Sequence, residues 1–201
     1  FMICKLSIIL TDMLENEHII QTADREVYEY GFQITMANIT NALIVLLIGI
    51  LMDSVLRVLL FYAVFISMRI FSGGFHAKTY TRCFCLFGTT CLLCMMSSYG
   101  IMHFININSV IAISGVLQGL CIYQMAPIEN ENHPLCAEEK RKFRFYSMIA
   151  FIFWLLVMII SSFKGYYVVS AVISVTLISV SILMVLAKKN GGEGVYEEKR
   201  A

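Results

Sequence analysis

The chain has 201 residues, of which 59% are hydrophobic and 14% are charged, and its mean hydropathy is +0.77. This composition excludes an ordinary soluble domain and is typical of a protein that crosses a membrane several times. The net charge of +1 offers no basic surface for a nucleic acid, so we expect no nucleic-acid partner.

The first 31 residues are predicted to form an amphipathic region at the membrane surface. Apolar residues from Met2 to Leu14 recur at helical spacing, and Lys5, Thr11 and Asp12 fall on the other side. Such a helix lies either in the plane of the lipid interface or against the rest of the protein. The sequence is compatible with both arrangements.

Six apolar runs are long enough to cross about 30 Å of hydrocarbon as helices. They cover residues 34–52, 54–71, 84–104, 107–126, 145–163 and 166–187. The sequence therefore predicts an all-α polytopic membrane protein with one membrane domain over residues 1–187, in which the six-span bundle occupies residues 32–187. The polar, glycine-rich tail over residues 188–201 is predicted to be disordered.

Lysine and arginine residues indicate which side of the membrane each connection faces. All but Arg57 and Lys164 lie in the N-terminal region, in residues 69–83, in residues 127–144 or in the tail. The positive-inside rule then predicts that both termini and both longer connections are cytoplasmic. We expect a multi-pass protein of the cell membrane.

The connection between the second and third spans, MRIFSGGFHAKTYTRCFCLF, combines two glycines with a histidine and a cysteine. A free thiol is only a few per cent thiolate at neutral pH, and a histidine within reach increases that fraction. His76 and Cys83 are therefore a candidate base and nucleophile. In one unbroken helix they would lie about 10.5 Å apart along the axis. The chain must leave the helical course between them, and Gly73 and Gly74 supply the backbone freedom.

A metal site and a non-catalytic role are the alternatives for these residues. A zinc site built from His76, Cys83 and Cys85 lacks an evident fourth ligand, so we expect no metal and no other cofactor. Four cysteines lie in apolar runs, namely Cys85, Cys91, Cys94 and Cys121, and most of them are interpreted as buried free thiols. Nothing in the spans themselves requires catalysis, so a non-enzymatic transport component or scaffold is the alternative.

Three motifs carry a resemblance to a known family. The string Arg69, Ser72, Gly73, Gly74, His76, Ala77 followed by Cys83 resembles the signature of the accessory gene regulator B family, membrane peptidases that process quorum-sensing propeptides in Gram-positive bacteria. The segment REVYEYGFQI, with Gly31 and Gln33, is similar to that family's pattern, as is MAPIENENHPL, with Ala126, Pro127 and Pro134. The resemblance extends over residues 20–144 or so.

The resemblance implies a cysteine endopeptidase, a thiol protease with Cys83 as nucleophile and His76 as base, facing the cytoplasm. It implies that the C-terminal part of a short precursor peptide is cleaved at the inner membrane surface through an acyl-enzyme thioester. A cysteine or serine of the peptide then closes a thiolactone or lactone ring, although release of a linear peptide fits the sequence equally. Membrane lipid and a second copy of the chain, as a homodimer, are the other expected partners.

Further residues have candidate roles in the site, and several of them also have an alternative role outside it. The supporting or oxyanion candidates are Gln33, Gly73, Gly74, Arg69 and Ser72, and the substrate-binding candidates are Lys78, Arg82, Lys140 and Arg141. Gln33 could instead hydrogen-bond a neighbouring helix, and Arg69 could snorkel to the membrane surface. The basic run from Lys140 could equally bind anionic lipid.

Overall fold

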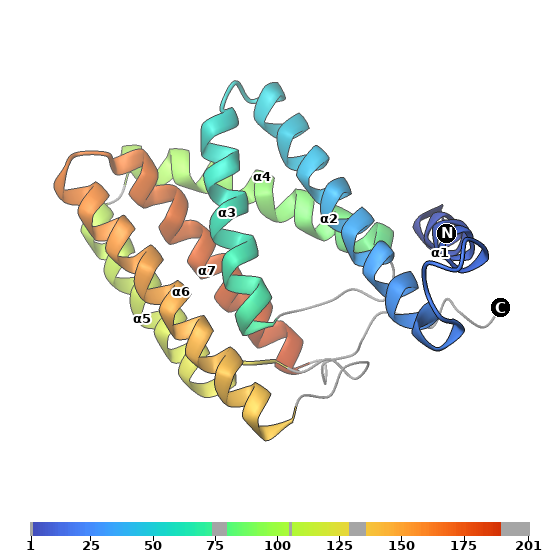
Figure 1. Ribbon diagram of the computed structural model, residues 1–201. Coiled ribbons are helices and arrows are strands. Elements are labelled where there is room, and N and C mark those ends of the chain that lie inside the picture. The colour runs from blue at the N-terminus through green and yellow to red at the C-terminus, as the bar shows by residue number, and fades with distance from the viewer. Residues whose placement is uncertain (1, 74–79, 105, 129–135, 190–201) are drawn as a thin grey trace. The chain divides into compact units, whose positions relative to one another are not determined.

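The computed structural model describes residues 2–73, 80–104, 106–128 and 136–189. Within these ranges the chain forms seven α-helices and one short 3-10 helix. They are α1 (Met2–Asn16), η1 (Thr22–Asp24), α2 (Arg25–Leu51), α3 (Val55–Ser72), α4 (Tyr80–Phe104), α5 (Ile107–Met125), α6 (Ala137–Phe163) and α7 (Tyr167–Lys189), as labelled in Figure 1. In the described part of the chain, α2 to α7 are the six helices that are long and apolar enough to cross a membrane, so the all-α, six-span prediction is confirmed.

Two helices begin well before the predicted spans. The first span was expected at residue 34 and the fifth at residue 145, but α2 begins at Arg25 and α6 begins at Ala137. Hydropathy marks where a helix enters hydrocarbon, whereas backbone hydrogen bonds continue into the interface. At 1.5 Å per residue, the 27 residues of α2 extend about 40 Å, which exceeds the hydrocarbon thickness. The predicted boundary between residues 31 and 32 falls inside α2, so the predicted interfacial region and the first span share one continuous helix.

The chain divides into two compact units, Phe1–Ile44 and Val45–Ala201. In the first unit, α1 ends in a Schellman turn: the Ile19 N–H donates to Leu14 O, the His18 N–H donates to Glu15 O, and His18 is left-handed with φ 55°. Arg25 then joins the two helices of this unit. Its side chain pairs with Asp12 and donates to a Glu15 oxygen at 3.0 Å.

In the second unit, α7 is the central helix. Eight consecutive residues, Ser170 to Leu177, are buried, and because they span more than two turns, every face of the helix is covered. The covering helices are α3, α4, α5 and α6, and Figure 1 shows α7 between α3 and the pair formed by α5 and α6. Small side chains such as Ser170, Ala171 and Ser174 allow this close approach in a membrane helix.

Buried polar groups in this bundle are paired between helices. Gln118 of α5 accepts a hydrogen bond from the Ser181 hydroxyl of α7 at 2.5 Å. The Ser170 hydroxyl donates to the Met158 carbonyl of α6 at 2.8 Å. In hydrocarbon no water satisfies such groups, so these bonds fix how α5 and α6 meet α7.

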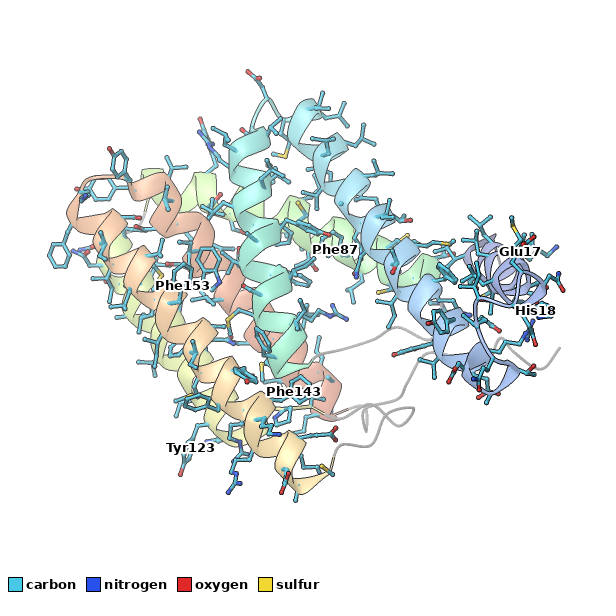
Figure 2. All side chains as sticks on the ribbon, in the orientation of Figure 1. Glu17, His18, Phe87, Tyr123, Phe143 and Phe153 are labelled. Carbon is cyan, nitrogen blue, oxygen red and sulfur yellow. The ribbon has the colours of Figure 1, made fainter. Side chains whose placement is uncertain are left out.

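Aromatic rings join α3 to α4. The rings of Phe61 and Phe65 on α3 lie 5.9 and 5.2 Å from the ring of Phe87 on α4, measured between centroids. All three side chains are buried, and Phe87 is labelled in Figure 2. Such tilted and edge-on contacts add about 0.5–1.5 kcal/mol per pair to the area that the rings bury.

The second half of α3 packs against α6. The indole N–H of Trp154 donates to the Ser67 hydroxyl oxygen at 2.7 Å, and the rings of Phe71 and Tyr146 lie 5.6 Å apart. Farther out, Phe153 and Tyr123 are exposed on the outer surface of the bundle, as Figure 2 shows. The end of α3 is thus supported by both α4 and α6.

Candidate active site

The helical course of α3 ends before His76. Helix α3 ends at Ser72, Gly73 leaves it with φ 72° and ψ −164°, and α4 begins at Tyr80. Gly73 therefore interrupts the helical course before His76. The predicted departure between His76 and Cys83 falls mainly on residues 76–79, outside the described residues, and Tyr80 to Cys83 are helical. His76, Gly74 and Lys78 lie outside the described residues.

Cys83 lies in the first turn of α4 and is half-buried. It precedes Phe87 by four residues, which is one helical turn, and Arg69 follows Phe65 by the same interval on α3. Phe65 and Phe87 are in contact. One turn from this contact, toward the end of α3 and the start of α4, the two helices carry Arg69 and Cys83. The two side chains interact electrostatically.

Arg69 is held in place by its own helix. Its guanidinium carbon lies 5.6 Å from the centroid of the Phe65 ring, within the range of a cation–π contact. The side chain is half-buried. The guanidinium gives this end of α3 a positive charge that interacts with Cys83.

The end of α3 is bonded to the segment that follows α5. The backbone N–H of Ile128 donates to the carbonyl of Ser72 at 3.0 Å. A Cβ atom added to Gly73 would collide with the carbonyl oxygen of Ile128. Glycine is therefore required at position 73 both by its positive φ and by this close backbone contact. Two of the motifs that carry the family resemblance, one containing Gly73 and one containing Pro127, meet here.

The same segment is held from the other side by α6. The Nε–H of Arg144 donates to the carbonyl of Ala126 at 2.8 Å. Ala126 is buried and caps the end of α5, where the last helical carbonyls have no partner within the helix. Residues 126–128 therefore form a brace between α6 and the end of α3. Hydropathy and motif spacing did not single out Arg144 or Ile128 as site residues.

Two supporting candidates already have hydrogen-bond partners. The hydroxyl of Ser72 is buried and donates to the carbonyl of Met68 at 2.7 Å, inside α3. The amide of Gln33 is buried in α2 and donates to the Glu29 carboxylate at 3.1 Å. Glu29 in turn lies 4.0 Å from Arg25. Gln33 thus belongs to a polar network of the first unit, and the structure gives its amide a partner on its own helix.

Comparison with known proteins identifies the family. A model of the family described as Accessory gene regulator B matches residues 7–186. The chain belongs to this family. Two curated relatives, both from Clostridium perfringens, are similar to it over 146 residues, which is 70% of this chain and 68% of each relative. "Putative AgrB-like protein" of strain SM101 is 25% identical, and "Putative AgrB-like protein 2" of strain 13 is 23% identical. No solved structure matches the chain.

Membership in the accessory gene regulator B family confirms the predicted resemblance. It implies a part in the processing of quorum-sensing peptides at a membrane, with a propeptide as partner. The match spans all six apolar helices apart from the last residues of α7. The motif containing Arg69, Gly73 and Cys83 therefore lies well inside the family region.

The remaining candidates are on the surface or in the bundle. Arg82, Lys140 and Arg141 are exposed, which suits contact with a peptide or with lipid headgroups. Cys91, Cys94 and Cys121 are buried and free, as predicted for most of the cysteines in apolar runs. Cys85 is an exception, because it is exposed. It lies two residues after Cys83 on the α4 helix, about 200° around the axis, and so faces away from the contact with α3.

Proposed function

We propose that this protein is a cysteine endopeptidase of the cell membrane that cleaves the C-terminal part of a quorum-sensing propeptide. Cys83 is the nucleophile and His76 is the general base and acid. The positive-inside pattern supports a site at the cytoplasmic face, where it would meet a short amphipathic precursor lying on the inner surface of the membrane. The family's setting implies a Gram-positive cell and a homodimer.

The reaction runs in two steps. The Cys83 sulfur attacks the scissile carbonyl, its proton passes to the His76 imidazole, and that proton is delivered to the leaving amine as the C–N bond breaks. The product is a thioester between Cys83 and the peptide. A cysteine thiol or serine hydroxyl within the peptide then attacks this thioester, giving the thiolactone or lactone and returning the proton to the Cys83 sulfur.

Ring closure requires that water does not reach the thioester first. Exchange of one thioester for another conserves the activated carbonyl, whereas hydrolysis releases a linear peptide. A site recessed at the membrane edge limits water, which favours the internal nucleophile. Exposed Arg82, Lys140 and Arg141 are suited to an acidic part of the precursor.

The observation that carries the proposal is the placement of Cys83 in the family motif. It lies in the first turn of α4, at the positive end of the helix dipole, and Arg69 adds a second positive charge. Both charges attract the negative charge that the sulfur carries when it attacks. Helix α3 ends at Ser72, before His76, and Gly73 leaves it with φ 72°, so in this proposal the residues that follow bring His76 toward the sulfur.

The experiment is co-expression with a candidate propeptide from the neighbouring reading frame, followed by mass spectrometry of the peptide products. We expect Cys83→Ser and His76→Ala each to abolish processing. Cys85→Ser is the matched control, because it removes an exposed thiol two residues away and should leave processing unchanged. Cys91→Ser and Cys94→Ser should also be active. Continued processing by the Cys83 variant would disprove the proposal.

A further inference from the structure

Arg144 and Gly73 are connected through a short chain of backbone contacts. Arg144 donates to the Ala126 carbonyl at 2.8 Å, and two residues later the Ile128 N–H donates to the Ser72 carbonyl at 3.0 Å. Gly73 follows Ser72 directly and touches the Ile128 backbone so closely that no Cβ fits. Gly73 is also where the chain leaves α3 toward His76.

We infer that Arg144 is a positioning residue for the proposed active site. By holding residues 126–128, it fixes the backbone against which the end of α3 and Gly73 rest, and Gly73 is the last described residue before His76. Arg144 does not touch the reacting atoms in this scheme. The inference rests on the proposed function, because it concerns the placement of the His76 segment relative to Cys83.

The Arg144 atom that donates the hydrogen bond distinguishes this positioning role from attraction of the substrate by charge. The donor is Nε, three carbons beyond the Cα, whereas a substrate carboxylate would be attracted to the guanidinium as a whole. The Ala126 carbonyl belongs to a buried residue at the end of a helix, so losing its donor leaves an unpaired acceptor. The charge of Arg144 and its hydrogen bond can therefore be removed separately.

Two substitutions make that separation. In Arg144→Gln, the amide nitrogen occupies the position of Nε, so the donor remains while the charge is lost. In Arg144→Met, a methyl group occupies that position, so both the donor and the charge are lost. Arg144→Ala is a second variant without the donor. Lys188→Gln is the matched control, because it removes one exposed positive charge at the end of α7, on the same side of the membrane by topology, without touching residues 126–128.

The measurement is the kcat and KM of propeptide cleavage by the full-length protein in lipid vesicles, normalised to the folded protein recovered by size-exclusion chromatography. Misplacing a catalytic group by about 1 Å can cost on the order of 100-fold, so we expect Arg144→Met and Arg144→Ala to lower kcat by about 10- to 100-fold. KM should be unchanged. Arg144→Gln should keep most of the wild-type kcat, and Lys188→Gln should match the wild type.

Other results would overturn the inference. If Arg144→Met keeps the wild-type kcat, residues 126–128 do not need this donor. If Arg144→Gln and Arg144→Met raise KM equally and leave kcat intact, Arg144 attracts the substrate by charge. Wild type and Cys83→Ser are assayed in parallel, so a wild type without activity would count against the proposed function, whereas an active wild type with an equally active Met variant would count against this inference alone.

Discussion

The guanidinium of Arg69 on α3 and the sulfur of Cys83 on α4 interact across two neighbouring helices. Their positions follow from an aromatic contact one turn deeper in the bundle, where the rings of Phe65 and Phe87 lie 5.2 Å apart. Phe65 also holds the Arg69 guanidinium at 5.6 Å. A packing contact between two rings therefore brings a charged side chain near the proposed nucleophile.

The first prediction concerns Arg69. Arg69→Met should slow the alkylation of Cys83 by iodoacetamide about tenfold, because the positive charge that attracts the attacking sulfur anion is lost. Arg69→Lys should keep an intermediate rate, since lysine retains the charge but not the planar group that stacks on Phe65. The measurement is the rate of Cys83 modification by mass spectrometry, with Cys4, Cys85 and Cys136 replaced by serine.

The control for this prediction removes a charge elsewhere. Lys164 caps the end of α6 at the opposite end of the bundle, so Lys164→Gln should leave the alkylation rate of Cys83 unchanged. Equal rates for wild type and Arg69→Met would show that Arg69 has no electrostatic effect on the sulfur.

The second prediction concerns the backbone at the end of α3. Gly73→Ala should lower the free energy of unfolding by about 1–3 kcal/mol, because φ 72° with ψ −164° is a region that only glycine adopts readily. The added Cβ also meets the Ile128 carbonyl, so processing of the propeptide should fall as well. Unfolding is measured by titration with sodium dodecyl sulfate in mixed micelles.

A second glycine provides the comparison. Gly100 lies inside α4 with nothing within 4 Å of its added Cβ, so Gly100→Ala should be neutral or stabilise the protein by up to about 1 kcal/mol. If Gly73→Ala behaved like Gly100→Ala, the contact between Gly73 and Ile128 would not constrain the protein.

The sequence predicted the elements of this fold better than their contacts. The six spans follow from apolar length alone, and the end of α3 at Ser72 follows from the backbone freedom of Gly73. Helix starts such as Arg25 were missed, because polar helical turns outside hydrocarbon leave no trace in hydropathy. The motif indicated Arg69 as a site residue, but its interaction with Cys83 on another helix depends on how α3 and α4 pack.

The brace around residues 126–128 could not be predicted in the same way. A backbone hydrogen bond from Ile128 to Ser72 has no side-chain signature, and an arginine in a basic run looks the same whether it binds lipid, peptide or a carbonyl. The motif containing Pro127 only indicated that this segment resembles the family. The contact with Gly73 appears only when α3, α5 and α6 are packed together.

The third prediction tests the hydrogen bond between α3 and α6. Ser67→Ala should lower the free energy of unfolding by about 0.6–1.7 kcal/mol, the range of interhelical hydrogen bonds in membrane proteins, because it leaves the Trp154 indole N–H without its partner. In a Trp154→Phe background, where no indole N–H remains, the same Ser67→Ala change should cost much less. Unfolding of the four variants in mixed micelles gives the coupling. Additive effects would mean that the 2.7 Å contact contributes nothing to stability.

The fourth prediction concerns the apolar side of α1. Leu6, Ile9 and Met13 are 47%, 54% and 59% exposed and recur at helical spacing, while Ser7 and Thr11 are buried. We propose that this apolar stripe, Leu6, Ile9 and Met13, lies in the lipid interface, because α1 is tied by the Arg25 ion pairs to the start of a membrane-spanning helix.

The test uses a fluorescent probe attached at single cysteines in vesicles that carry a quencher on the lipid acyl chains. A probe at Ile9→Cys should be strongly quenched, and a probe at Asn16→Cys, an exposed polar position at the end of α1, should be quenched far less. Ile9→Cys in a chain that also carries Met13→Glu should lose much of its quenching, because a carboxylate in the stripe opposes insertion. Equal, weak quenching at both probe positions would show that the stripe faces water or protein instead of lipid.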